Sequence, residues 1–185
     1  MAEANVKNAA NQTAKQESKG RDQIRKLAFT IVFIAAGVAL APFTSIPVGF
    51  AKINPTQHFL NVLAAVSVGP IWGGFMAYAI GQTRILLGVG TIFAFPGGMI
   101  GAILSGITWR LTGNLILTAL AEVIGTGVIG SAVCGFIVAP LIASKATFLA
   151  LFPAFFFSTL AGSILAVVVI GILRKAGVPG LELKR

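Results

Sequence analysis

The stretch TALAEVIGTGVIG, residues 118–130, places one glutamate inside a long apolar segment. Glu122 is the only acidic residue between Asp22 and Glu182. A carboxylate at the centre of a bilayer costs roughly 2.5–3.5 kcal/mol on insertion scales, so such a residue usually has a partner or a function. The stretch therefore predicts a membrane helix whose glutamate faces the interior of the protein.

The composition of the whole chain is that of an all-α integral membrane protein. Its 185 residues are 56% hydrophobic and 10% charged, with a mean hydropathy of +0.92. The apolar material predicts six transmembrane helices, over residues 26–42, 55–69, 70–88, 97–112, 114–139 and 145–174. The second and fourth are short for a hydrocarbon core of about 30 Å. We therefore expect the preceding segments, 43–54 and 89–96, to dip into the protein as structured loops.

The formal charge of +9 is concentrated at the two ends of the chain, which argues against nucleic-acid binding. The positive-inside rule places both termini in the cytoplasm, which requires an even number of spans, and six spans meet this requirement. We expect the protein to lie in the cell (cytoplasmic) membrane. We expect residues 1–25 to form a flexible polar tail or, in part, a helical extension of the first span. Residues 26–175 are expected to form a single membrane domain, and residues 176–185 a short basic tail.

Polar residues that could make specific contacts fall at the predicted outer ends of the helices and inside the fifth one. Gln57, His58 and Asn61 begin the second span, and positions 57 and 61 share a helical face. Helix geometry places Arg84 about 9 Å further along the membrane normal than Glu122. Glu122 therefore either forms a buried ion pair with Arg84 or contacts a ligand or proton, and Arg84 could alternatively extend toward water.

The predicted spans lack the residues that common catalytic sites require. The chain has one histidine and its predicted spans contain no aspartate, so neither a zinc site of the HExxH kind nor a Ser-His-Asp triad can form. The glycine-rich run GVGTIFAFPGG, residues 88–98, lacks the Lys-Ser/Thr ending of a phosphate-binding loop. We expect no enzyme activity, no metal and no cofactor.

Three motifs together resemble one membrane protein family. They are IPVGFAKINPTQHFLNVLAAVSVGP (46–70), TRILLGVGTIFAFPGGMIGAILSG (83–106) and AEVIGTGVIG (121–130). The chain resembles the ThiW family of S components of energy-coupling-factor (ECF) transporters. The resemblance implies a six-helix S-component fold that binds a thiamine precursor, most simply hydroxyethylthiazole, from the outside. It also implies a transmembrane coupling subunit and two ATPases as partners, with ATP hydrolysis on those ATPases.

The resemblance also implies roles for individual residues. The substrate-binding candidates are Gln57, His58, Asn61, Arg84, Thr91, Glu122 and Thr126. An Ala-x-x-x-Ala pattern on the first helix, matched by Ala35 and Ala39, implies the docking face for the coupling subunit, although Ile31 stands where a small residue is expected. Our hypothesis is that Glu122 bonds the heterocycle while Asn61 or His58 bonds the hydroxyl.

Two alternatives remain open from the sequence. One is another small heterocycle, such as the aminopyrimidine half of thiamine, for which an acidic partner is chemically natural. The other is a membrane scaffold that transports nothing, in which Glu122 and Arg84 only pair.

Overall fold

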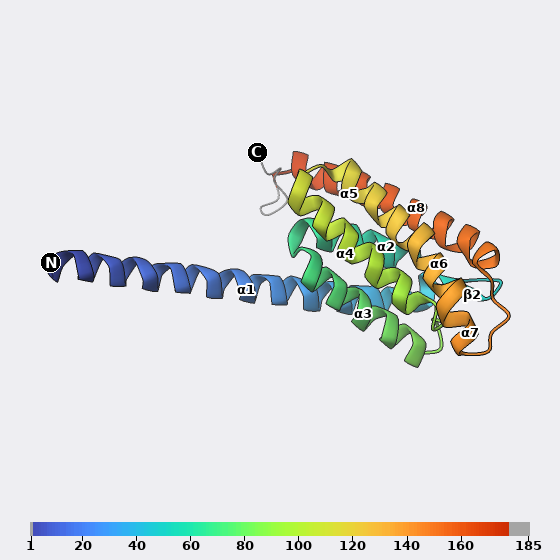
Figure 1. Ribbon diagram of the computed structural model, residues 1–185. Helices are drawn as coiled ribbons and strands as arrows, with labels where there is room; N and C mark the ends of the chain where they lie inside the picture. Colours follow the sequence, from blue (N-terminus) through green and yellow to red (C-terminus); the bar gives the residue numbers. More distant parts are fainter. Residues whose placement is uncertain (1, 178–185) are drawn as a thin grey trace.

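Apolar helix-forming residues make up most of the chain. A computed structural model describes residues 2–177, which form six helical stretches and one short β-hairpin (Figure 1). The fifth stretch is continuous but alternates between α-helical and π-helical hydrogen bonding. The elements are α1 (Ala2–Thr44), β1 (Ile46–Val48), β2 (Ala51–Ile53), α2 (Pro55–Ser67), α3 (Pro70–Leu86), α4 (Ala94–Thr112), α5 (Leu115–Glu122), η1 (Val123–Gly130), α6 (Ser131–Val133), η2 (Cys134–Val138), α7 (Ala139–Leu141) and α8 (Phe148–Lys175). The predicted count of six helices is confirmed.

Helix length varies among the six stretches. Among the described residues, three segments are long and apolar enough to cross a membrane on their own: Asn11–Thr44, Leu115–Leu141 and Phe148–Lys175. Helix α2 has 13 residues, which at about 1.5 Å per residue is well short of the hydrocarbon thickness. Helix α4 begins at Ala94, three residues before the predicted fourth span, and its 19 residues rise about 28 Å, just under the hydrocarbon thickness.

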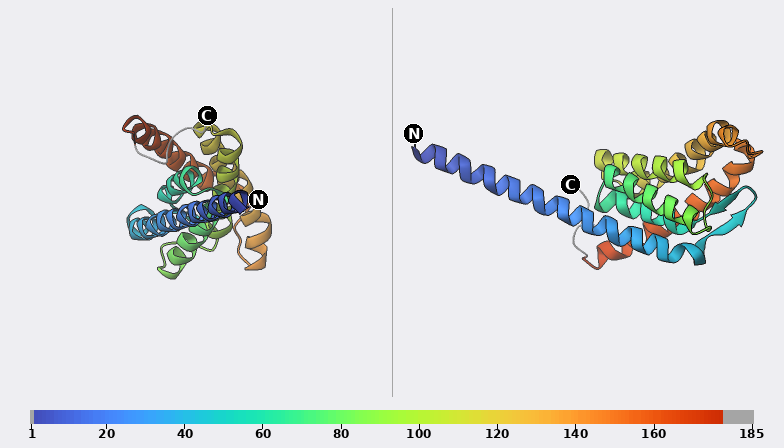
Figure 2. Two further views of the ribbon diagram at one scale, coloured as in Figure 1. Left: turned by 90° about the vertical axis from the view of Figure 1, so that its left-hand side faces the viewer. Right: turned by 90° about the horizontal axis from the view of Figure 1, so that it is seen from below.

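The first helix is longer than the predicted span. It continues without a break from Ala2 to Thr44, and its N-terminal part projects from the bundle (Figures 1 and 2). The structure thus has the helical extension, which was one of the two expectations for residues 1–25. Residues 178–185 of the predicted basic C-terminal tail lie outside the described residues.

Short polar residues begin three of the helices. Asn54 precedes Pro55 at the start of α2 and accepts a hydrogen bond from the backbone N–H of Gln57 at 3.0 Å. Asn114 and Thr147 cap α5 and α8 in the same way. Such caps satisfy N–H groups that the first turn of a helix leaves free, and the cap at Asn54 fixes where the predicted site residues of α2 begin.

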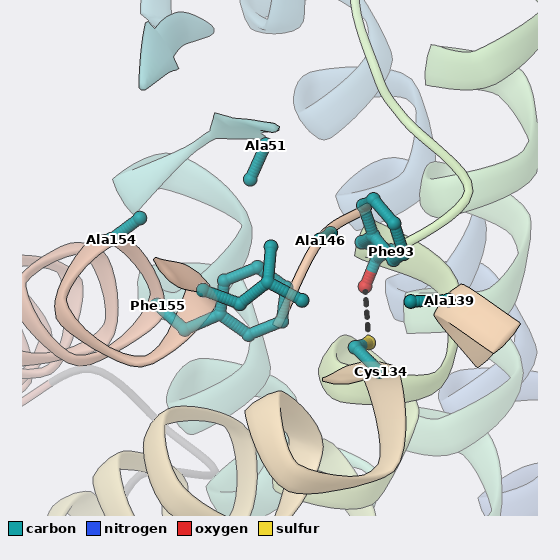
Figure 3. Packing of buried hydrophobic residues seen from close by; sticks show 8 residues of the cluster. Ala51, Phe93, Cys134, Ala139, Ala146, Ala154 and Phe155 are labelled. Atoms are coloured by element: carbon teal, nitrogen blue, oxygen red, sulfur yellow. Dashed lines mark hydrogen bonds between the residues drawn. The ribbon is translucent and has the colours of Figure 1, made fainter. Parts of the chain in front are cut away.

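A β-hairpin and a loop close the end of the bundle away from the projecting part of α1 (Figure 2). Strands β1 and β2 pair antiparallel, with Pro47 opposite Lys52. Ala51 of the hairpin and Phe93 of the loop before α4 are buried in one cluster with Cys134 and Phe155 (Figure 3). Of the two predicted loops, segment 43–54 buries Ala51 and Asn54 and segment 89–96 buries Phe93, while strand β1 of the hairpin stays exposed.

Glycine allows α4 and η1 to approach each other closely. A Cβ atom on Gly125 would lie 2.7 Å from the Cα of Gly101, and one on Gly130 would lie 2.6 Å from the Cα of Gly97. Lipid provides no hydrophobic drive between helices, so close contact of this kind supplies much of their attraction. The π-helical turns begin directly after Glu122, at Val123, and π-helical turns often mark functional sites.

We expect Gly125→Ala to destabilise the protein, because the added methyl group meets the backbone of α4. Overpacking of this kind costs about 1–3 kcal/mol. Thermal unfolding of the detergent-purified protein should show a midpoint several degrees below that of the wild type. Gly171→Ala is the matched control, since nothing lies within 4 Å of a Cβ there. Equal midpoints for the two variants would contradict the packing argument.

Candidate functional site

Glu122 is completely buried and lies at the centre of a hydrogen-bonded cluster. Its Oε1 atom is 2.9 Å from His58 Nδ1, 2.9 Å from Asn61 Nδ2 and 3.0 Å from Thr126 Oγ1. Its Oε2 atom accepts from Ser105 Oγ at 3.3 Å. Donors from α2, α4 and η1 therefore converge on one carboxylate, which is the arrangement that makes a buried charge tolerable.

The donors around Glu122 are themselves held in place. Asn61 Nδ2 also donates to the carbonyl of Gly98 at 3.1 Å, so both of its N–H groups are used. Thr126 Oγ1 lies 3.0 Å from the carbonyl of Gly97 as well, and its single proton can serve either that oxygen or Glu122. The carbonyls of Gly97 and Gly98 thus orient the groups that surround the carboxylate.

Arg84 does not pair with Glu122, which corrects the ion-pair alternative raised from the sequence. Among the described residues, the titratable side chain that contacts the Glu122 carboxylate is His58, at 2.9 Å. Arg84 Nη1 donates to Gln57 Oε1 at 2.7 Å, and Nη2 donates to the carbonyl of Lys52 at 3.0 Å. Only 2% of Arg84 is exposed, so it does not extend into water either. It joins α3 to α2 and to the hairpin.

The loop after α3 is tied to the same hairpin. Lys52 Nζ donates to the carbonyl of Gly88, and Arg84 Nη2 also lies 3.3 Å from Ser45 Oγ at the end of α1. Asn54 Nδ2 donates to the same Ser45 oxygen at 3.1 Å. These hydrogen bonds, which we call the Arg84 layer, connect the hairpin to the end of α1 and to α3.

A cavity lies between the Arg84 layer and the Glu122 cluster. Its lining residues are Lys52, Ile53, Asn54, Gln57, His58, Arg84, Ala94, Gly98, Thr126, Phe155 and Ser158. The cavity measures about 20 Å³, which is about the room that one water molecule needs. A molecule larger than water therefore fits in this cavity only when the hairpin or the lining side chains move.

Two buried polar atoms on the cavity lining have no hydrogen-bond partner among the described residues. They are Arg84 Nε and Ser158 Oγ, and only 1% of Ser158 is exposed. Buried polar groups in native proteins are almost always satisfied, so each exception needs a reason. Two residues that line one small cavity thus each have a spare polar group, which a polar ligand would satisfy.

The predicted site residues fall into three groups. Gln57, His58, Arg84 and Thr126 line the cavity, while Asn61 and Glu122 lie behind His58, outside the lining. Thr91 stands apart from both groups, in the loop before α4, where its carbonyl accepts from the backbone N–H of Ala94.

Other site residues were missed by the sequence analysis. Ser158 belongs to a row of small residues along the last helix, and such a row is also what helix packing in a membrane requires, so it did not single out Ser158 as a site residue. Ser105 had the same ambiguity within its glycine-rich helix. Lys52, Asn54 and Phe155 gave no signal, because their place at the cavity depends on how the hairpin folds over the bundle.

Helix α1 separates its small residues onto two faces. Gly37 and Ala41 are buried, and a Cβ on Gly37 would lie 2.6 Å from Ile80. Ala35 and Ala39 are exposed on another face, as is Ile31. The Ala35–Ala39 face is therefore free of contact with the protein's own helices.

Comparisons with known proteins agree with this architecture. The model of the family described as "Thiamine-precursor transporter protein (ThiW)" matches residues 27–176. No curated protein sequence matches the chain. The fold is similar to a solved structure described as "Structure and mechanism of the S component of a bacterial ECF transporter", with a TM-score of 0.68 and 18% identity, covering 84% of this chain and 99% of that one.

The fold is thus that of an ECF transporter S component, and the protein is a multi-pass membrane protein of the transporter class. More particularly, the chain belongs to the ThiW family of thiamine-precursor transporters, since the family model covers most of it.

We expect Arg84→Gln to loosen the hairpin, because the variant loses the bonds to Gln57 and to the carbonyl of Lys52. Hydrogen exchange of the amides in residues 46–53 should become several-fold faster while exchange in the body of α8 stays unchanged. Lys145→Gln, an exposed lysine in the loop before α8, serves as the control. Unchanged exchange in the hairpin of the Arg84 variant would show that other contacts hold it.

Proposed function

We propose that this protein is the substrate-binding subunit of an ATP-driven ECF importer and that its ligand is a thiamine precursor, most simply hydroxyethylthiazole. The family and the fold support a transporter subunit that binds a small molecule. The observation that carries the choice of site is the pair of unsatisfied polar groups, Arg84 Nε and Ser158 Oγ, on the lining of one buried cavity.

His58 is the link between the cavity and the buried carboxylate in this proposal. Its Nδ1 is engaged by Glu122 at 2.9 Å, so Nε2 is the ring nitrogen left for a ligand. A neutral imidazole offers Nε2 as an acceptor, and a protonated one offers it as a donor. Glu122 then acts by fixing the ring of His58 rather than by touching the heterocycle itself, which revises the hypothesis drawn from the sequence.

The chemistry of the lining suits a small, partly polar ring. Phe155, Ile53 and Ala94 supply apolar walls, and Gly98 keeps one wall close to the backbone. A hydroxyethylthiazole needs a partner for its ring nitrogen and another for its hydroxyl. Nε2 of His58 and the two spare groups at Arg84 and Ser158 are enough for both.

The aminopyrimidine half of thiamine fits this lining less well. An aminopyrimidine is best recognised by a free carboxylate, but the oxygens of Glu122 already have four side chains within hydrogen-bond distance, and Glu122 lies outside the cavity lining. The thiazole is therefore the better match.

We propose further that the transporter lies in the cytoplasmic membrane and that the Ala35–Ala39 face docks on a transmembrane coupling subunit, which joins two ATPases. Small side chains let helices of two membrane proteins approach closely, and this face is exposed. Its position on α1 leaves the cavity under the hairpin clear.

Ligand binding by the purified subunit tests the substrate assignment. Hydroxyethylthiazole should raise the thermal midpoint more than aminopyrimidine or thiamine does. Ser158→Ala should weaken thiazole binding about 2- to 10-fold, the worth of one hydrogen bond. Ser163→Ala is its matched control, because Ser163 is also a buried, unpartnered serine of α8 but lies outside the cavity lining.

The variants at His58 and Glu122 test the linkage between them. We expect His58→Ala to abolish measurable binding and Glu122→Gln to weaken it at least 10-fold, which is about 1.4 kcal/mol. Unchanged affinity in Glu122→Gln would refute the positioning role. A protein that responds to none of the three ligands would instead be a scaffold.

Docking is tested by exchanging the two exposed alanines for large residues. Ala35→Phe and Ala39→Phe should reduce co-purification of the coupling subunit and ATPases by most of its wild-type level, since the helices can no longer approach. Ala161→Phe, at an exposed alanine of α8, is the matched control. Full co-purification with both α1 variants would exclude this face.

A further inference from the structure

A second, polar cavity lies at the opposite end of the bundle from the hairpin, where α1 leaves the other helices. It has a volume of about 260 Å³ and lies between α1, the turn that joins α2 to α3, and the end of α4. The lining residues that matter for its chemistry are Asp22, Arg25, Lys26, Gly69, Trp109 and Arg110. None of these residues belongs to the site under the hairpin.

The charge of this cavity is positive. Arg25 and Lys26 both pair with Asp22, so the one carboxylate on the lining is shared between two cations. Arg110 has no ion pair among the residues that the structure describes. With three basic side chains and one acid, the lining carries a net charge of +2.

The Arg110 side chain is seated on the turn rather than extended away from it. Gly69 has φ +87°, and a Cβ atom there would lie 2.9 Å from Arg110 Nη2. The absence of a side chain at this position lets the guanidinium lie over the start of α3. That helix begins at Pro70 with no side-chain cap, so backbone N–H groups of its first turn add positive potential on the same side.

The setting of the cavity points to a lipid. Ile24, which precedes Arg25 on α1, and Ile71, in the first turn of α3, are 68% and 76% exposed, as side chains in contact with lipid would be. The end of the bundle that carries these basic residues is the one that the positive-inside rule assigns to the cytoplasm. Basic pockets between helices at this level bind the headgroups of anionic lipids.

We propose that this cavity binds the phosphodiester headgroup of an anionic phospholipid from the cytoplasmic leaflet, with Arg110 as the principal contact and Lys26 and Arg25 around it. The bound lipid fastens α1 to the α2–α3 turn at the point where the helix leaves the bundle.

The test uses the full-length protein in detergent with phosphatidylglycerol or phosphatidylcholine added at equal concentration. Phosphatidylglycerol should raise the thermal midpoint by several degrees more than phosphatidylcholine, and native mass spectrometry should show about one retained phosphatidylglycerol. Arg110→Gln should remove most of this difference. Asp22→Asn removes the only acid on the lining and should increase phosphatidylglycerol retention, the opposite direction.

Lys145→Gln, which removes an exposed charge far from this cavity, is the matched control and should behave as the wild type. Equal protection of Arg110→Gln and wild type by phosphatidylglycerol would overturn the proposal. Protection of the wild type by inorganic phosphate alone, to the same extent as by the lipid, would also overturn it and assign the cavity to a free anion. Arg110 is exposed, so its replacement should leave the fold intact, which circular dichroism checks.

Discussion

The buried carboxylate of Glu122 is the constraint around which the inner half of the bundle is arranged. A buried carboxyl group must find hydrogen-bond partners in the protein, and here these are His58 and Asn61 on α2, Ser105 on α4 and Thr126 on η1. These elements can reach one carboxylate only because α4 and η1 pack glycine against glycine. The hydrogen bonds to Glu122 and the close packing of α4 against η1 therefore depend on each other.

Arg84 organises the outer half in a comparable way, but with neutral partners. Its guanidinium holds the side chain of Gln57, the carbonyl of Lys52 and the hydroxyl of Ser45, so one cation links α1, α2, α3 and the hairpin. The two charged groups are thus separated, each within its own polar cluster. Had they paired directly, as one reading of the sequence allowed, no cavity with spare polar groups would lie between them.

The small volume of that cavity follows from the same arrangement. The hairpin is held over the cavity by a few hydrogen bonds of Lys52, Asn54 and Arg84. The opposite wall, next to the Glu122 cluster, is held by helix packing and by the bonds of the buried carboxylate. The hydrogen bonds of the hairpin can be replaced by bonds to water when the hairpin moves, but the packed contacts around Glu122 cannot. A ligand is therefore expected to enter by displacing the hairpin, while the wall next to the Glu122 cluster keeps its structure.

The sequence by itself determined the class of the protein, the count of six helices and the burial of Glu122. Long apolar runs and an isolated carboxylate are local signals, and a bilayer tolerates the carboxylate only inside the protein. The sequence also brought together Gln57, His58 and Arg84 as site candidates, since polar residues at helix ends are rare in such a chain. Tertiary structure alone decided that Glu122 pairs with His58 rather than Arg84, that Ser158 faces the cavity, and that Lys52 and Asn54 cover it. Those outcomes depend on the rotation of each helix and on the path of the hairpin, which distant contacts set and no local pattern encodes.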